Sequence, residues 1–356
     1  MLHRSIRRHA TAILHATFAF TCLLVSCAAA PQAPTAKPDA PTAAARAESR
    51  PFLWRIDGQV PCWLFGTFHL PDERITDLVP EVERAFADVD AVFTELDMDT
   101  AMSPKLLQAM ALPDGKTMRD LAPPEMLAQL RKRLGGEGAV TAVQGMRPWV
   151  ISMQVMIGKR RSGTPLDMML WKDAKSAGKE VGGIETIDEQ MAVFDGLGLD
   201  GEVQLLRDTL DVLDDYEKRG LDVTEEMIVA WCAGDTKRTL GFFEEMNGHG
   251  VWKRLSRTIL VDRNLRMAER IDRMLHDAPQ KKFAFAVGAG HLIGETNVVD
   301  LLRARGYVVT RVPESAVNVD EEIEQLEREV QARQGRLDQL RQKRATLLGT
   351  PRKKAG

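Results

Sequence analysis

The chain has 356 residues, of which 28% are charged, and a formal net charge of −3 at neutral pH. That length suffices for one large domain, or for a domain with an insertion. A mildly acidic chain argues against nucleic acid as a partner, because phosphate backbones are bound by clustered lysine and arginine.

The first 26 residues are typical of an export signal. Three arginines stand among the first eight residues, and the apolar stretch over 10–26 is short for a membrane span. It ends at residues 24–27 (LVSC), which resemble the bacterial lipobox. The resemblance implies a lipoprotein signal peptide over 1–26, a lipid anchor on Cys27 and a place in the bacterial cell envelope. Alanine at position 28 favours the outer membrane.

A tether is expected between the lipid and the folded part. Residues 27–50 are rich in alanine, proline and threonine, which predicts a semi-extended segment. Loss of the signal peptide removes three arginines and no acidic residue, and moves the net charge from −3 to −6. Cys62 and Cys232 then remain, and an exported protein could join them, although nothing in the sequence places them within bonding distance.

The folded domain, expected over 51–314, begins with two strands and a crossover. Residues 52–56 and 62–66 predict a hairpin around the two-residue turn Asp57-Gly58. The apolar spacing over 80–88 predicts a helix, and the β-branched and aromatic run over 91–96 predicts a strand. A strand, a helix and a second strand imply a right-handed parallel crossover.

Residues 100–280 have a mostly helical pattern with one interruption. A helix over 167–177 is expected to end at Gly178, and a short strand over 179–185 follows it. A new helix is expected from residue 186 onward. We interpret this region as a helical insertion.

The end of the folded part repeats the pattern of its beginning. A buried strand is expected over 283–287, a helix over 297–305 and a final strand over 307–312. Each half thus has a strand, a Gly-x-x-His motif, a helix and a strand. The sequence predicts an α/β fold with a mixed β-sheet, a helical insertion over its active edge and a C-terminal amphipathic helix.

The two Gly-x-x-His motifs run from Gly66 to His69 and from Gly288 to His291. Each glycine is expected to allow a close backbone approach or a positive φ. Ligands bind at the carboxyl ends of strands in open α/β sheets. The ends of four predicted strands supply the candidate side chains, which are His69, Glu95, Glu185 and His291.

Two imidazoles and one or two carboxylates suit a divalent ion of the manganese, cobalt or zinc type. We predict His69, His291, Glu95 and Glu185 as metal ligands, with Glu95 as either a ligand or a general base. A bound metal would lower the pKa of water towards about 7, and a carboxylate outside the metal shell would accept the proton.

Five segments resemble the TraB/GumN family, which includes the Tiki-type metalloproteases. They occur in family order over nearly the whole folded region, at residues 64–70, 93–96, 182–186, 262–264 and 287–294. The resemblance implies a metal-dependent hydrolase that acts on peptide bonds in a peptide or protein substrate.

The resemblance assigns site residues one by one. It carries over directly onto His69, Glu95 and His291, and with less support onto Glu185 and Arg263. An arginine near a metal site would bind a substrate carboxylate or steady an oxyanion.

Plainer roles stay open for three of these residues. Glu95 could cap a helix while Asp97 or Asp99 is the exposed acid. Glu185 could occupy the first turn of the following helix. Arg263 and its neighbour Asn264 could belong to a solvated helix face.

Two other functions stay open as well. One is a metal-independent esterase or amidase in which a histidine is the general base. The other is a non-enzymatic surface protein that binds and sequesters a peptide signal. The remaining histidines, His249 and His276, are expected at the surface.

Residues 319–348 predict a helix with a heptad pattern. Six of the eight core positions are apolar, with Ile323, Val330, Leu337 and Arg344 at position a and Leu326, Arg333, Leu340 and Leu347 at position d. The pattern indicates self-association through a short coiled coil. A single amphipathic helix docked on its own domain is the alternative.

Overall fold

The computed structural model describes residues 50–99, 104–113, 115–158, 163–247, 250–313 and 316–349. They form two units, one ending at Pro313 and one consisting of the C-terminal helix. The signal peptide, Cys27 and nearly all of the tether lie outside the described residues, so the expectations for them stay predictions. His249 lies outside them too.

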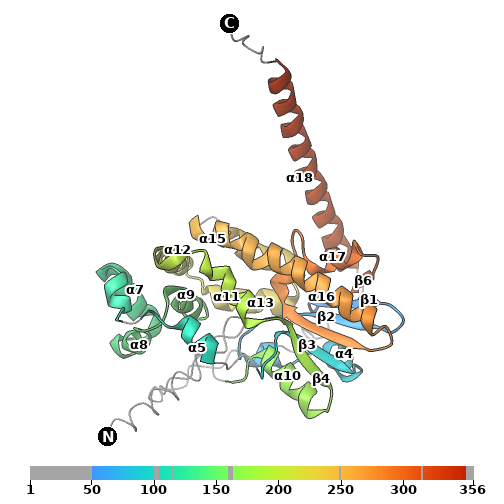
Figure 1. The fold of residues 1–356 in the computed structure, drawn as a ribbon, viewed down its shortest axis with the longest axis horizontal. Helices are drawn as coiled ribbons and strands as arrows, with labels where there is room; N and C mark the ends of the chain where they lie inside the picture. Colours follow the sequence, from blue (N-terminus) through green and yellow to red (C-terminus); the bar gives the residue numbers. More distant parts are fainter. Residues whose placement is uncertain are drawn as a thin grey trace. The chain divides into compact units, whose positions relative to one another are not determined.

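Within the described residues, six strands form one mixed sheet in the order β4-β3-β5-β2-β1-β6 (Figure 1). The strands are β1 (Leu53–Asp57), β2 (Cys62–Thr67), β3 (Ala91–Leu96), β4 (Glu180–Glu185), β5 (Phe283–Gly288) and β6 (Val308–Arg311). The pairs β4–β3, β3–β5 and β5–β2 are parallel, whereas β1 is antiparallel to both β2 and β6. The expected mixed α/β fold is confirmed.

The predicted hairpin is present, but its connection is longer than a two-residue turn. The register pairs Ile56 with Cys62, so residues 57–61 join the paired segments. Pro61 has no N–H to donate to a ladder, which explains why β2 begins only at Cys62. The crossover from β2 to β3 also differs in detail, since β5 lies between these two strands.

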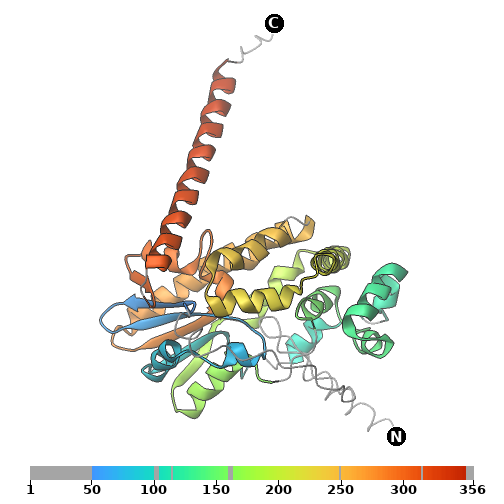
Figure 2. The same ribbon diagram turned by 180° about the vertical axis from the view of Figure 1, so that it is seen from behind.

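Helices cover both faces of the sheet, as the view from behind also shows (Figure 2). Side chains alternate along the strands, so Trp54 and Leu64 pack on one face while Leu53 and Phe65 pack on the other. The first face is covered by α16 (Arg263–Asp277) and α17 (Val298–Arg303). The second is covered by α3 (Glu73–Thr76), α4 (Pro80–Ala87), α10 (Leu166–Ser176) and α13 (Val223–Ala233).

The helical insertion has apolar cores of its own. Its remaining helices are α5 (Pro104–Met110), α6 (Met118–Leu121), α7 (Pro124–Leu134), α8 (Glu137–Ala142), α9 (Pro148–Met156), α11 (Ile187–Asp195), α12 (Gly198–Lys218), α14 (Thr236–Asn247) and α15 (Gly250–Ser256). A π-helical segment, Arg257–Asp262, joins α15 to α16. Trp231 of α13 donates a hydrogen bond to the Gly66 carbonyl at 2.9 Å, and Phe243 of α14 lies against Gly290. The insertion therefore contacts the strand ends that carry the histidines.

Cys62 and Cys232 are both free thiols. Cys62 is buried and contacts the Lys281 carbonyl at 3.6 Å, whereas Cys232 contacts the Arg74 carbonyl at 3.6 Å. The possible disulfide between them is not formed.

The C-terminal unit is a single helix, α18 (Ala316–Gly349), as the heptad pattern predicts. Six of its apolar side chains are 42–64% exposed, which are Val319, Ile323, Leu326, Val330, Leu337 and Leu340. None of the described helices combines the length and the hydropathy that crossing a lipid bilayer requires.

Candidate metal centre

The four parallel strands end at the same edge of the sheet. Glu185 is the last residue of β4, Glu95 lies one residue before the end of β3, and His291 and His69 follow β5 and β2. Helix α4, which follows β2, and helix α10, which precedes β4, cover one face, whereas α16 and α17, directly before and after β5, cover the other. Such a change of side is where ligands bind in open α/β sheets.

The glycines of the two motifs permit close backbone packing. A Cβ on Gly66 would stand 2.7 Å from Phe52 Cβ and 3.0 Å from Ala289 Cα. A Cβ on Gly288 would stand 3.0 Å from His69 Nε2 and 3.2 Å from Glu95 Oε1. Neither glycine has a positive φ. Close approach is therefore the reason for glycine at both positions.

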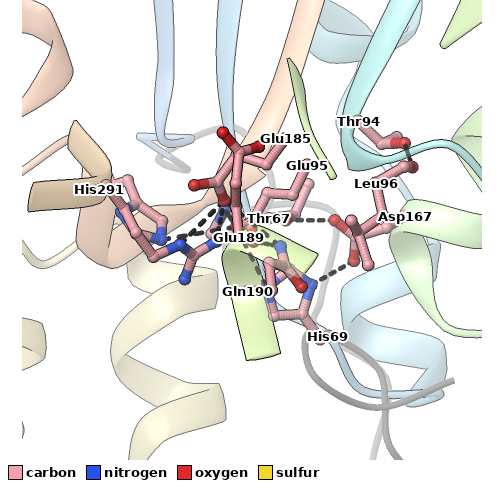
Figure 3. A network of polar contacts seen from close by, with 12 residues as sticks. Thr67, His69, Thr94, Glu95, Leu96, Asp167, Glu185, Glu189, Gln190 and His291 are labelled. Carbon is pink, nitrogen blue, oxygen red and sulfur yellow. Dashed lines mark hydrogen bonds and ion pairs between the residues drawn. The ribbon is translucent and has the colours of Figure 1, made fainter. Parts of the chain in front are cut away.

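Asp167 orients His69 (Figure 3). His69 Nδ1 lies 2.5 Å from Asp167 Oδ2, and Thr67 Oγ1 donates to Asp167 Oδ1 at 2.6 Å. A carboxylate acceptor favours a proton on Nδ1, which leaves the lone pair on Nε2. A carboxylate behind a histidine is the usual support of a metal-binding imidazole.

Asn264 orients His291 in the same way. Its Nδ2 donates to the Thr296 carbonyl at 3.0 Å, so its Oδ1 faces His291 Nδ1 at 2.6 Å. The amide oxygen can only accept, so His291 also carries its proton on Nδ1. Both histidines thus use Nδ1 for their supporting residue and leave Nε2 to face the centre of the site.

Both Nε2 atoms face one carboxylate oxygen. Glu95 Oε1 lies 3.8 Å from His69 Nε2 and 3.6 Å from His291 Nε2, and it accepts from the Gly288 N–H at 2.7 Å. We call these three side chains above the bare Cα of Gly288 the Gly288 cradle.

The donor atoms of the Gly288 cradle fit a divalent metal chemically. Two imidazole nitrogens and a carboxylate oxygen are a usual set for zinc, manganese or cobalt. No three His, Cys, Asp or Glu side chains in the described part of the chain are already arranged to hold an ion. Binding would therefore require small movements of these side chains.

Arg263 joins Glu95 to Glu185. Its Nη2 donates to Glu95 Oε2 and to Glu185 Oε2, both at 2.6 Å, and its Nε donates to Glu185 Oε2 at 2.8 Å. All three side chains are at most 3% exposed. The solvated-face interpretation is therefore wrong for Arg263, and for Asn264, which is 1% exposed.

Glu95 and Glu185 also do not have the helix-terminal roles that the sequence left open. Glu95 is a buried residue of the cradle, and it is not the N-cap or C-cap residue of any described helix. Glu185 ends β4, and the following helix is instead capped by Thr186 together with Glu189. Glu185 contacts Gln190 and the arginines Arg263 and Arg266.

Gln190 lies against both carboxylates. Its Nε2 donates to Glu95 Oε2 at 3.2 Å and to Glu185 Oε2 at 3.4 Å. Because the carboxylates accept only from the NH2 group, the orientation of the amide is fixed and its Oε1 points away from both carboxylates. That Oε1 is buried and has no hydrogen-bond partner among the described residues. It is thus a buried acceptor that the described residues leave unsatisfied.

The pKa values follow from burial and from the charges around the cradle. Burial alone would raise the pKa of Glu95, but Arg263 and the two histidines lower it to about 2. Burial and the charge of Arg263 lower the pKa of His291 to about 3. Burial also opposes protonation of His69, yet Asp167 outweighs it and the pKa of His69 is raised. At neutral pH Glu95 is ionised and His291 is neutral.

Two residues of the site were missed from the sequence, Asp167 and Gln190. Asp167 stands at helical spacing with Leu170, Trp171 and Ala174 on the buried face of α10, and that signal was available. Gln190 has no comparable signal, because an uncharged polar residue on a short helix gives no indication of burial.

Fold and site together define a class: an α/β protein with a nitrogen and oxygen donor set at the switch point of its sheet. The model of the TraB/PrgY/gumN family matches residues 52–311. The chain therefore belongs to the TraB/PrgY/gumN family, as the sequence motifs predict.

Curated relatives extend this likeness. The chain is 30% identical over 315 residues to metalloprotease TIKI2 of Danio rerio, which covers 74% of this chain and 61% of the relative. It is 28% identical over 320 residues to metalloprotease TIKI1 of Homo sapiens, with 75% and 63% covered. It is 26% identical over 314 residues to a TIKI homolog of Nematostella vectensis, with 73% and 67% covered. No solved structure matches the chain.

Proposed function

We propose that the chain is a metal-dependent hydrolase that cleaves peptide bonds, with its metal held by His69, His291 and Glu95. One observation carries the proposal: two histidines, whose Nδ1 atoms are held by Asp167 and Asn264, direct their Nε2 atoms at the same carboxylate oxygen. The relatives named metalloproteases support the reaction class. The chain spans only 61% and 63% of the length of the first two relatives described.

The residues of the Gly288 cradle have separate tasks. A metal bound there would supply an activated water and polarise a carbonyl. Glu95, with a pKa of about 2, supplies a fixed negative charge and is a poor proton acceptor at neutral pH. We therefore favour the role of ligand for Glu95 over that of general base.

Arg263 and Glu185 support the cradle in this proposal. Arg263 holds Glu95 Oε2, so that Oε1 alone faces the histidines. Glu185 binds Arg263 from the other side, which favours a positioning role over the predicted role as a metal ligand. Arg263 remains the candidate cation beside a developing oxyanion.

The substrate would enter beside His69. The His69 side chain is 22% exposed, whereas those of His291 and Glu95 are 6% and 2% exposed. The buried Oε1 of Gln190 has no partner among the described residues, and a side-chain movement that uncovers it would let it accept the N–H of a peptide bond held there. A peptide or protein is therefore the proposed substrate class.

Metal binding by the chain from Arg50 onward tests the proposal. We expect about one manganese, cobalt or zinc ion per chain, and loss of the ion in both His69→Ala and His291→Ala. His276→Ala is the matched control, because His276 is exposed in the last turn of α16. Peptide hydrolysis should stop with a chelator and return when the ion is added back.

Other outcomes separate the alternatives. Hydrolysis that is insensitive to the chelator would favour a metal-independent esterase or amidase. Tight peptide binding without turnover, unchanged in Glu95→Gln, would favour a non-enzymatic binding protein. Failure of the wild-type chain to bind any of the three ions at micromolar concentration would refute the metal site.

For the location of the protein, we propose a lipid anchor on Cys27 and attachment to the outer membrane of a bacterium. The proposal rests on the basic start, the apolar stretch and residues 24–27.

A further inference from the structure

From helix α18 we infer that two copies of this chain associate through an antiparallel, two-stranded coiled coil. The helix is 34 residues long, which corresponds to about 50 Å. Its apolar stripe is exposed in the single chain, and the heptad phase is continuous from Ile323 to Leu340. A second copy of the same helix is the partner that the stripe and the charges fit.

The charges beside the stripe specify the orientation. In the sequence, positions e and g are acidic at 320, 322, 327 and 329, and basic at 336, 341 and 343. In a parallel pair, position g of one heptad faces position e of the next heptad on the partner. That arrangement sets 322 against 327 and 336 against 341, and both pairs carry like charges. An antiparallel pair sets the acidic half of one helix against the basic half of the other.

One antiparallel register matches both the core and the charges. When Leu326 faces Leu337 of the second copy, Ile323 faces Leu340 and Val330 faces Arg333. In the same register Asp320 of one copy faces Arg341 of the other at the e positions. At the g positions, the acidic residues 322 and 329 face the basic residues 343 and 336. Each of these pairs has opposite charges. Arg341 also contacts Asp338 on its own helix, and both side chains are exposed. Replacing this contact by one to Asp320 of the second copy therefore costs little free energy.

The two arginines in the core positions also oppose a parallel pair. Position d of one parallel helix faces position d of the other, so Arg333 would meet Arg333 and Arg344 would meet Arg344. Two like charges inside an apolar seam are strongly unfavourable. In the antiparallel register Arg333 lies beside Val330 and Arg344 beside Val319. Their aliphatic stems can cover apolar surface while the charged groups reach water.

Cysteine crosslinking tests the orientation directly. Leu326→Cys and Leu337→Cys are made separately in the chain from Arg50 onward, which contains every described helix and strand. In the antiparallel register two copies of residue 326 are 11 residues apart along the axis, about 16 Å, which is too far for a disulfide. We expect a disulfide-linked dimer when the two variants are mixed, and none with either variant alone.

The alternative outcomes overturn the inference. A disulfide with Leu326→Cys alone means a parallel pair. A monomeric mass at about 100 µM in light scattering means that no pair forms, and a dimer that persists when the chain ends at Pro313 means that another surface is responsible. The unaltered chain, oxidised in parallel, accounts for crosslinks through Cys62 and Cys232.

Charge reversal provides a second and independent test. Arg341→Glu sets like charges against Asp320 twice in the antiparallel dimer, and should weaken dimerisation roughly tenfold. Asp320→Arg combined with Arg341→Glu restores opposite charges and should restore the affinity. In a parallel pair Arg341→Glu would instead face Arg336 and strengthen the dimer, which would contradict the inference.

Discussion

The imidazole of His69 and the carboxylate of Glu95 lie so close to Gly288 that a Cβ there would stand 3.0 and 3.2 Å from them. Each group that converges there is held from behind by a second residue: Asp167 behind His69, Asn264 behind His291, and Arg263 behind Glu95. The supporting residues fix tautomers and charges, so they decide which atoms face the cradle.

Gly288→Ala should weaken metal binding with only a moderate loss of stability. The added methyl group would stand 3.0 Å from His69 Nε2 and 3.2 Å from Glu95 Oε1, so both side chains must shift by a few tenths of an ångström. Overpacking of this kind costs about 1–3 kcal/mol of unfolding free energy. Metal titration and urea denaturation measure the two effects.

The control for this change is Gly58→Ala. Gly58 is exposed, and the nearest atom to an added Cβ is the Val60 carbonyl oxygen at 3.6 Å, an ordinary contact. Metal binding by Gly288→Ala as tight as that by Gly58→Ala would show that the cradle is not the binding site.

Asp167→Asn should weaken metal binding about 10- to 100-fold while the chain stays folded. The amide is similar in shape to the carboxylate but lacks its charge, so the support of the His69 Nδ1 proton is weaker. Isothermal titration with zinc or manganese measures the change. Asp99→Asn is the control, because Asp99 is an exposed acid paired with Lys175. Equal affinities of the two variants would count against the role of Asp167.

At the scale of elements, one interaction joins three of them beside the site. Glu189 closes the capping box of α11 by accepting from the Thr186 N–H at 2.9 Å. Arg270 of α16 binds Glu189 at 2.6 and 2.8 Å and also donates to the Ile184 carbonyl of β4 at 2.7 Å. The end of β4, the start of α11 and the middle of α16 are thereby held together.

Glu189→Gln should destabilise the fold by about 1–2 kcal/mol at neutral pH and by roughly half of that near pH 3. The hydrogen bonds of Arg270 are the main cause that lowers the pKa of Glu189 from 4.5 to about 2. A lowered pKa stabilises the folded state above pH 4.5, and this contribution is lost as the pH falls towards 2. The estimate is reduced because the side chain is 26% exposed.

Urea unfolding of both chains at pH 6 and pH 3 measures this pH dependence. The difference between the wild type and the variant should shrink at the lower pH. If the difference stays constant with pH, the charge of Glu189 is not its source, and shape alone explains the contribution.

At the scale of the whole molecule, the folded unit and α18 are separate bodies with separate tasks. The folded unit carries the proposed catalysis, and α18 carries the inferred association. The sequence before residue 50 adds a third element, the predicted lipid anchor, which lies outside the described residues.

Cys27→Ser should release the protein from the membrane fraction of a bacterial host, because the thiol that would carry the lipid is absent. Fractionation with an antibody against the folded unit measures the distribution. Cys22→Ser is the control, since Cys22 falls within the predicted signal peptide. Equal membrane association of both variants would contradict lipidation at Cys27.

Local sequence patterns determined much of this protein. The strands that end near Glu95, Glu185, His69 and His291, the helical insertion and the C-terminal helix all follow from apolar spacing and turn residues, which act over a few residues of chain. The two Gly-x-x-His motifs likewise led to both histidines of the candidate site.

Only the tertiary structure decided how these parts meet. Insertion of β5 between β2 and β3 places His291 beside His69 and Glu95, and these pairings join residues 192 and 221 positions apart. The supporting roles of Asp167 and Gln190, and the burial of Arg263, depend on which helices pack at that edge. Local sequence patterns do not predict such contacts, because strand order and helix packing depend on the complete hydrophobic core.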